Sequence, residues 1–407
     1  MTVARRELVR TATAASLLLP HISRAQTPPN KVIKIGVLTD MSGPYRDVTG
    51  PTSVACAHQA VEDFGAHGFA VEVIAGDHQN KPDVGASIAR QWFDRDGVDM
   101  ITDVPTSSIA LAVNSIAREK NKAYINTGAG TTDLTSKQCT PVTIHWGYDT
   151  YMNASSSGNA VLRAGGDSWY FITADYVFGQ QLFRDTAGIV TKAGGHVLGN
   201  SAYPFPGTTD FSSFLVQARA TGAKVLGLAN AGDDTVNCIK QAREFGLTRT
   251  GVTLAALVFS VTGVRALGLE IGQGLLVTES FYWDLNDRTR AFLKRVKPKT
   301  LSNYPNNVHA ACYAGTLHYL KSVAALGVDR ARDGDAVIAH MKSVPADDDA
   351  YGRTIIREDG RALTTPYLFR VKTPAESKGE WDFYELVTTT PPEQAALPVK
   401  DCPLIRG

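Results

Sequence analysis

The hydrophobic positions of this chain alternate between two periods from residue 31 onward. Short β-branched runs such as 31–40 (KVIKIGVLTD) and 69–77 (FAVEVIAGD) have the length and composition of strands. Each is followed by a segment with apolar residues at helical spacing, for example 52–64. Buried strands that alternate with amphipathic helices are typical of parallel sheets covered by helices on both faces. The pattern therefore predicts an α/β protein.

The predicted strands fall into two sets, separated by residues 145–151 (HWGYDTY). After residue 282 the pattern becomes mostly helical, which indicates a return to the first set. We therefore expect two doubly wound parallel-sheet lobes with a cleft between them. The expected boundaries are 31–145 and 282–345 for lobe 1, 146–281 and 346–390 for lobe 2, and 391–407 for an irregular C-terminal tail.

The first twenty-five residues differ from the rest of the chain. A basic start with Arg5, Arg6 and Arg10 precedes a short apolar stretch, and Ser23 and Ala25 provide the small residues of a cleavage site. These features predict a signal peptide, residues 1–25, and hence a periplasmic location. The Arg5-Arg6 pair is compatible with the twin-arginine route, and an ordinary secretory signal is the alternative. Beyond this stretch no apolar run has the length that would predict membrane insertion.

Charge and cysteine content narrow the function classes. The 41 Lys and Arg residues nearly balance the 40 Asp and Glu residues, and no basic stripe suggests nucleic-acid binding. Cys139 and Cys402 lie in polar loops that contain proline, so an oxidising compartment would allow them to pair. Such a bond would tie the tail to the end of lobe 1. The other three cysteines lie in helical patterns, as expected for buried packing.

The chain lacks the motifs of common catalytic and cofactor sites. It contains no G-x-S-x-G elbow, no phosphate-binding G-x-x-x-x-G-K-[ST] loop and no H-E-x-x-H pair. It also contains no C-x-x-C motif. We therefore expect a protein that is not an enzyme and that uses neither a metal ion nor a cofactor.

Four segments carry a family resemblance. They are IGVLTDMSGPY (35–45), PTSSIALAV (105–113), INTGAGTTDLT (125–135) and YVFGQQL (176–182). In order and spacing the chain resembles the type I periplasmic solute-binding proteins of the leucine-binding group, over about residues 31–390. The resemblance implies two αβ lobes joined by three crossovers that close over a small molecule. It also implies delivery of that ligand to a membrane permease of an ABC importer.

The resemblance places an anion-binding site at two loops of lobe 1. Ligands of open α/β sheets lie beyond the carboxyl ends of the strands, where the amino ends of helices offer free N–H groups. Thr106, Ser107 and Ser108 follow a predicted strand and open a helix, so their hydroxyls and backbone N–H groups could receive a carboxylate. The residues that match the family's carboxylate-binding positions are Ser107 and the loop of Gly128, Ala129 and Gly130. Ser107 could instead serve only as a helix cap.

Two departures from the family pattern concern the ligand's ammonium group. Amino-acid receptors of the group hold the ammonium with a threonine, where this chain has Gly130, and with an acidic residue, where it has Val258 and Phe259. A buried ammonium without a carboxylate partner would be poorly solvated, whereas an aromatic ring offers apolar contact. These departures favour a carboxylate without an α-amino group, such as a benzoate, a phenylpropanoid or an aryl-keto acid.

Aromatic residues gather at the predicted cleft loops, where they could stack on a flat ring. The remaining candidate ligand contacts are Tyr45, Tyr151, Tyr176, Phe178, Ala231, Phe259 and Tyr282. Three alternatives stay open at this level. One is a branched-chain amino acid or amide receptor that takes its counter-charge from Asp149 or Glu279. The others are an exported α/β hydrolase and a sensor lobe of a membrane-bound kinase.

Overall fold

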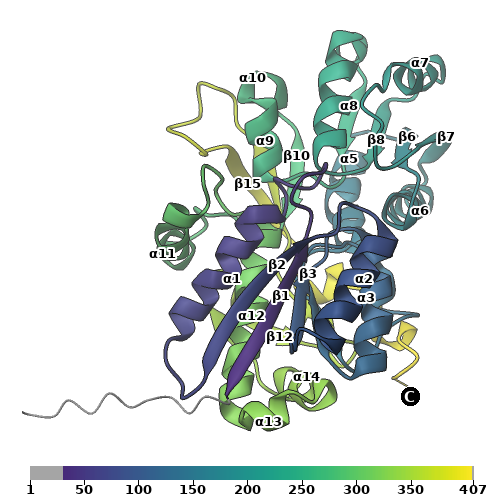
Figure 1. The fold of residues 1–407 in the computed structure, drawn as a ribbon. Helices are drawn as coiled ribbons and strands as arrows, with labels where there is room; N and C mark the ends of the chain where they lie inside the picture. Colours follow the sequence, from purple (N-terminus) through teal and green to yellow (C-terminus); the bar gives the residue numbers. More distant parts are fainter. Residues whose placement is uncertain (1–30, 406–407) are drawn as a thin grey trace, which may run out of the picture.

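A computed structural model describes residues 31–405, and the predicted signal peptide lies outside this part of the chain. Within it, two α/β lobes are stacked end to end (Figure 1), as the strand and helix pattern predicted. Among these residues, no helix has the length and apolar character needed to cross a bilayer.

Lobe 1 is built on a five-stranded parallel sheet in the order β2-β1-β3-β4-β5. Its strands are β1 (Val32–Thr39), β2 (Ala70–Asp77), β3 (Met100–Asp103), β4 (Ala123–Asn126) and β5 (Thr143–His145). On one face, α1 (Gly50–Phe64) and α12 (Asn307–Leu326) bury a core with Ile33 and Ile35. On the other, α2 (Pro82–Asp94) and α3 (Ser107–Lys120) cover Leu38 and Ile101. The helices α11 (Asp287–Val296), α13 (Val328–Ala331) and α14 (Gly334–Ser343) complete this lobe.

Lobe 2 has a four-stranded parallel sheet in the order β7-β6-β8-β9. Its strands are β6 (Ser168–Ala174), β7 (His196–Tyr203), β8 (Val225–Ala229) and β9 (Thr253–Ala256). One face carries α6 (Val177–Lys192), and the other carries α7 (Ser212–Ala220) and α8 (Asp233–Glu244). Beside them lie α9 (Val261–Leu267), α10 (Leu269–Gly272) and the antiparallel strands β10 (Leu276–Glu279), β14 (Tyr367–Val371) and β15 (Tyr384–Thr389).

The third crossing between the lobes comes later than the sequence pattern indicated. Strands β11 (Ala346–Asp348), β12 (Gly352–Ile356) and β13 (Ala362–Leu363) form a small antiparallel sheet. Its buried residues Ala346, Ile356 and Ala362 belong to the same core as Ile33 of lobe 1. Residues 346–363 therefore belong with lobe 1, and the chain returns to lobe 2 only before β14. Short strands carry no signal of the lobe they join, so the expected boundary at 346 is corrected.

A buried ion pair connects the first crossover to the end of the lobe 1 segment that precedes the third crossover. Arg361 and Asp149 are 2% and 1% exposed, and the guanidinium Nε lies 3.1 Å from the carboxylate. Nη2 of Arg361 also donates to the carbonyl of Gly147, 2.9 Å away, and Thr364 Oγ1 donates to the same oxygen. These contacts hold the first crossover against Arg361 and against Thr364, where the chain leaves lobe 1 for the third crossover.

The first crossover continues into a short helical run that the sequence pattern did not predict. It consists of α4 (Thr150–Asn153), a π-helical turn (Ala154–Gly158) and α5 (Asn159–Arg163). Asp149 caps its start by accepting a hydrogen bond from Met152 N at 2.8 Å. Short 3-10 turns occupy Thr132–Thr135, Leu247–Thr250, Lys297–Lys299, Pro392–Ala395 and Val399–Asp401.

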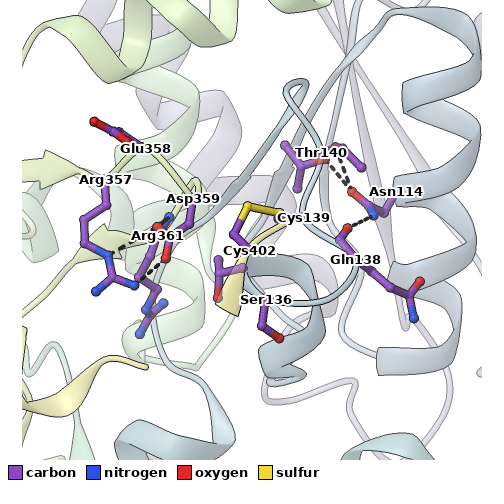
Figure 2. Close-up of a disulfide and its surroundings, with 12 residues drawn as sticks. Asn114, Ser136, Gln138, Cys139, Thr140, Arg357, Glu358, Asp359, Arg361 and Cys402 are labelled. Atoms are coloured by element: carbon purple, nitrogen blue, oxygen red, sulfur yellow. Dashed lines mark hydrogen bonds and ion pairs between the residues drawn. A yellow bond between two sulfur atoms is a disulfide. The ribbon is translucent and has the colours of Figure 1, made fainter. Parts of the chain in front are cut away.

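The C-terminal tail connects the two lobes a fourth time. It leaves β15 in lobe 2, and Ala395 is buried in a core that also contains Met152 of α4. Further along the tail, Cys402 forms a disulfide with Cys139 of lobe 1. Figure 2 shows this bond between the loop of Gln138 and Thr140 and the turn that carries Arg357 and Asp359. The other three cysteines are buried and unbonded.

Candidate functional site

Two small cavities lie between the lobes at the carboxyl ends of the parallel strands. The first, here the Phe259 cavity, has a volume of about 20 Å³ and is lined by Asn153, Phe259, Ser260, Thr278, Asn307 and Val308 among others. The second, here the Tyr176 cavity, has about 10 Å³ and is lined by Tyr45, Pro105, Gly128, Tyr176 and Phe178 among others. Val48, Tyr148 and Ala231 line both, so the two cavities adjoin. Each has room for about one water molecule.

The lobe 1 side of the site is a sharply turned segment after β3. Asp103 and Val104 have φ values of 77° and 59°, in the left-handed region that a β-branched residue rarely occupies. Val104 N is held by a 2.8 Å hydrogen bond to the carbonyl of Leu38. This strained turn brings Pro105 to the Tyr176 cavity and starts α3 at Ser107.

Ser107 is a buried hydroxyl residue at the start of α3 that lines neither cavity. The residue is fully buried, and within residues 31–405 its Oγ has no hydrogen-bond partner. It is the first residue of α3, where backbone N–H groups have no partner within the helix. The N-cap Thr106 offers them no side-chain hydrogen bond. A carboxylate at this helix end would satisfy both kinds of donor.

The two hydroxyl neighbours of Ser107 have other surroundings. Thr106 Oγ1 donates to Oδ1 of Asn80, whose amide in turn donates to Asp40 at 2.7 Å. Ser108 is half-buried and lines neither cavity. Thr106 therefore orients the 40–45 turn through Asn80. Of the three predicted hydroxyls, only that of Ser107 is both buried and without a partner within residues 31–405.

The second predicted loop, 128–130, reaches the site mainly through its backbone. A Cβ on Gly128 would lie 2.7 Å from Pro105 Cα, so only glycine allows this close approach. The Gly128 carbonyl accepts a hydrogen bond from Tyr148 OH at 3.1 Å. A Cβ on Gly130 would come within 2.9 Å of the Tyr148 ring and 3.0 Å of the Phe178 ring. Gly128 thus lines the Tyr176 cavity, whereas Ala129 and Gly130 line neither one.

Lobe 2 contributes an apolar wall. Phe178, Ala231 and Phe259 are buried, with exposures of 2%, 5% and 4%, and all three line a cavity. Phe178 comes from the first turn of α6, and Ala231 follows the end of β8. Lobe 2 also lines the Phe259 cavity with the polar side chains of Asn153, Ser260 and Thr278, so this wall is not purely apolar.

The lobes touch each other directly at the mouth of the site. The hydroxyls of Tyr45 and Tyr176 are 2.7 Å apart, and both rings stack on Phe205 with centroid distances of 5.3 and 4.5 Å. Asp233 N donates to the Pro44 carbonyl at 3.1 Å. Its neighbour Gly232 has no room for a Cβ, which would lie 2.3 Å from that oxygen. The structure therefore represents a closed arrangement of the lobes.

Glu279 is the first of the two acidic residues that could pair with a ligand ammonium near Phe259. It is 1% exposed and lines neither cavity. Its Oε1 accepts from Val261 N at 2.7 Å and from Tyr384 OH at 2.8 Å, and Oε2 accepts from Asn307 N at 3.2 Å. Burial raises the pKa of Glu279 to about 8. Glu279 thus joins the starts of α9 and α12 rather than presenting a free charge.

Asp149, the second acidic candidate for a ligand ammonium, is also engaged. It is paired with Arg361 and caps α4. Burial raises the pKa of Asp149, and Arg361 opposes that shift. Both of its oxygens therefore serve the hinge.

Two predicted aromatic contacts lie away from the cavities. Tyr282 is packed with Phe369 and Tyr384 in the lobe 2 core, and its hydroxyl donates to the Trp381 carbonyl at 2.8 Å. Tyr151 is half-buried on α4 and lines neither cavity. For Tyr282 the expectation of ligand contact is thus corrected, because its ring faces the core of its own lobe.

Several residues at the cavities escaped the sequence reasoning. Asn153 lines the Phe259 cavity from α4, donates to the Leu257 carbonyl at 3.2 Å and has a buried Oδ1 without a partner among the described groups. Thr278 and Val308 reach the site from β10 and α12. Tyr148, by contrast, is one of the aromatic residues that the sequence already placed at the first crossover, and it lines both cavities. The capping pattern before α12, with Asn306 as N-cap, was the one signal that could have placed Val308.

The site does not have the composition of a metal centre. Within residues 31–405 no group of three or more His, Cys, Asp or Glu side chains could hold a metal ion. The two cavities offer an aromatic and aliphatic lining, with polar side chains from Asn153, Thr278 and Asn307 at the Phe259 cavity.

Comparison with known proteins agrees with this architecture. The family model of periplasmic binding proteins matches residues 32–380. A periplasmic binding protein from Burkholderia mallei is 45% identical, with a TM-score of 0.87, over 91% of this chain and 98% of that one. A branched-chain amino acid ABC transporter ligand-binding protein from Burkholderia xenovorans is 38% identical, with a TM-score of 0.79 and the same coverage.

More distant structures share the fold. A solute-binding protein of an ABC transporter from R. palustris, solved with benzoate, is 18% identical, with a TM-score of 0.78 over 90% of this chain and 96% of that one. Comparison with curated proteins finds no match. The family match, the two hinged parallel-sheet lobes and the enclosed site between them show that the chain belongs to the type I periplasmic binding proteins, as a substrate-binding receptor of an ABC transporter.

Proposed function

We propose that this receptor closes over a small aromatic carboxylate, such as a benzoate, a phenylpropanoid or an aryl-keto acid. The observation that carries the proposal is the engagement of Glu279 and Asp149 with the protein itself. An α-ammonium group bound here would have neither acid as a partner and would be buried without its counter-charge.

The two walls of the site support the two ends of such a ligand. Ser107 Oγ and the start of α3 suit the carboxylate, and Phe178 and Phe259 suit the ring. Solved relatives with 18% and 20% identity hold benzoate and 4-hydroxybenzoate. Because the cavities measure only about 20 and 10 Å³, a ring can enter only when the lobes and the rings of Tyr45 and Tyr176 move apart.

Ligand capture then follows from hinge closure. A ligand held by lobe 1 gains its remaining contacts only when lobe 2 approaches, so it shifts the population from open to closed. From the periplasm, the closed receptor would deliver its ligand to a permease in the membrane. Export would depend on the predicted signal peptide, by the twin-arginine or the general route.

A branched-chain amino acid is the second candidate, because the relative from Burkholderia xenovorans carries that description. Calorimetric titration with benzoate, 4-hydroxybenzoate, leucine and 4-methyl-2-oxopentanoate separates the candidates. The proposal predicts that the aromatic acids bind and that leucine binds more weakly than its deaminated analogue. Tighter binding of leucine than of the keto acid and both aromatic acids would contradict it.

A further inference from the structure

Asp103 is a buried acid whose surroundings the receptor function does not explain. It is fully buried, and among the described residues it forms no ion pair. Its Oδ1 accepts a hydrogen bond from Thr127 Oγ1 at 3.3 Å, and its Oδ2 has no partner in the same part of the chain. A buried carboxyl group without a cation is costly to ionise.

The carboxyl group of Asp103 lies directly behind the anion-binding loops. A Cβ on Gly128 would be 2.8 Å from Asp103 Oδ1, and Gly128 N donates to the Asp103 carbonyl at 3.1 Å. Gly128 and Pro105 both line the Tyr176 cavity. Asp103 therefore lies next to two residues that line the Tyr176 cavity, without lining it itself.

The groups that surround Asp103 supply no positive charge. Thr39 of β1, Ser53 of α1 and Thr127 after β4 offer hydroxyls that oppose its protonation, and Asp40 adds a like charge that favours it. The other titratable groups that feel Asp103 are two thiols and two phenols, each with a pKa raised mainly by burial: Cys56 of α1, Cys312 of α12, Tyr124 of β4 and Tyr148 of the first crossover. Burial dominates and raises the pKa of Asp103 to about 7.

We propose that Asp103 is a specificity-determining residue of the cleft: as a neutral acid it admits a carboxylate at Ser107, and as a carboxylate it repels one. This inference rests on the proposed function. It implies that an anionic ligand binds together with a proton when the free protein has Asp103 ionised. The proton comes from the solvent and stays on the Asp103 carboxyl, so no other group changes its charge.

The test measures benzoate affinity by calorimetry between pH 6 and pH 8.5, in buffers of different ionisation enthalpy. For the wild-type protein the affinity should fall by up to about tenfold per pH unit above 7, the limit for one linked proton. Proton uptake should approach one per ligand at the alkaline end. Asp103→Asn should bind with a constant affinity and no uptake, whereas Asp94→Asn, at a surface position on α2, should behave as wild type.

A benzoate affinity that is independent of pH in the wild-type protein would overturn the inference, and so would an unchanged slope in Asp103→Asn. Because the wild-type proton uptake needs no variant, a failure of Asp103→Asn to fold would not remove the test. Leucine binding that strengthens as pH rises through 7 would also overturn it, since Asp103 would then act as a counter-charge.

Thermal unfolding of the free protein separates this inference from the proposed function. A raised acid pKa stabilises the fold below the unfolded value and loses that contribution as pH rises toward 7. Asp103→Asn should therefore gain in melting temperature over wild type at pH 8 relative to pH 5. A difference that is the same at both pH values would contradict a neutral Asp103 whatever the ligand is. Absence of benzoate binding at every pH would contradict the proposed function alone.

Discussion

The two lobes differ in the groups that they place around the site. Lobe 1 has an unpartnered hydroxyl and a buried acid, neither of which lines a cavity, and a backbone turn with two left-handed residues that brings Pro105 to the Tyr176 cavity. Lobe 2 presents buried rings and aliphatic groups such as Phe178 and Phe259. The lobe 1 groups keep polar atoms unsatisfied, which costs stability, whereas the lobe 2 groups are also part of their own lobe's core. The unsatisfied polar groups of lobe 1 thus add no stability, whereas the lobe 2 rings both line the site and stabilise their own lobe.

The largest expected effect on stability comes from removing the ring of Phe259 from the apolar wall of lobe 2. Phe259→Ala should lower the free energy of unfolding by about 3–5 kcal/mol, because it deletes a buried ring that packs against Gly263. Urea denaturation measures the loss. Phe245→Ala, at a side chain that is 38% exposed, should cost much less. Equal losses in the two variants would show that the wall at Phe259 is not part of the lobe 2 core.

The covalent link between the lobes is the next largest contribution. Replacing Cys139 and Cys402 together by serine should lower the free energy of unfolding by about 2–4 kcal/mol, because the bond closes a long loop. It should also enlarge the radius of gyration of the ligand-free protein in small-angle scattering. Cys238→Ser, at a buried free thiol in lobe 2, controls for loss of a buried sulfur. An unchanged scattering curve would mean that the tail does not limit opening.

On the polar side the expected effect is on binding rather than on folding. Ser107→Ala removes a hydroxyl that makes no bond in the closed protein. The free energy of unfolding should therefore change by less than about 0.5 kcal/mol, while carboxylate affinity falls about tenfold. Ser115→Ala on the exposed face of the same helix should leave both unchanged. A loss of stability without a loss of affinity would assign Ser107 to helix capping.

The smallest expected effect belongs to the contact between the two sides. Tyr176→Phe deletes the hydroxyl pair with Tyr45 but keeps the stack on Phe205. One neutral hydrogen bond across the mouth should be worth about 1 kcal/mol, so affinity should fall about fivefold. Tyr170→Phe, whose hydroxyl pairs with Ser201 inside lobe 2, is the matched control. If both variants bind as wild type, the tyrosine pair does not hold the lobes closed.

The sequence was sufficient for features that arise locally or from periodicity. The alternation of strands and helices gave the two parallel sheets. The start of α3 at Ser107 was also predictable, because strand ends and helix starts are marked by residue type. The strands from 346 to 363 could not be assigned to a lobe, since a short apolar strand fits either core. Tyr282 looked like a cleft residue because aromatic residues cluster at crossovers, but its ring turns into lobe 2.

The sequence could not predict the site residues that come from segments far apart in the chain. Asn153 lies on a helix whose π-turn has no clear sequence pattern, and Asn307 is brought to the cleft by a helix of the other lobe's core. The carboxyl oxygens of Glu279 accept hydrogen bonds from three donors that are far apart in the chain. Only the folded arrangement shows that a buried acid near Phe259 is already satisfied.

The disulfide between the tail and lobe 1 also affects how the protein withstands cleavage. The two cysteines are 263 residues apart in sequence, so the bond encloses the whole of lobe 2 and all three crossovers in one covalent ring. A protease that cuts any single loop within this ring leaves both fragments attached, and the nicked receptor keeps its two halves at the same high local concentration. In the periplasm, a single cleavage within this ring would therefore not release either fragment.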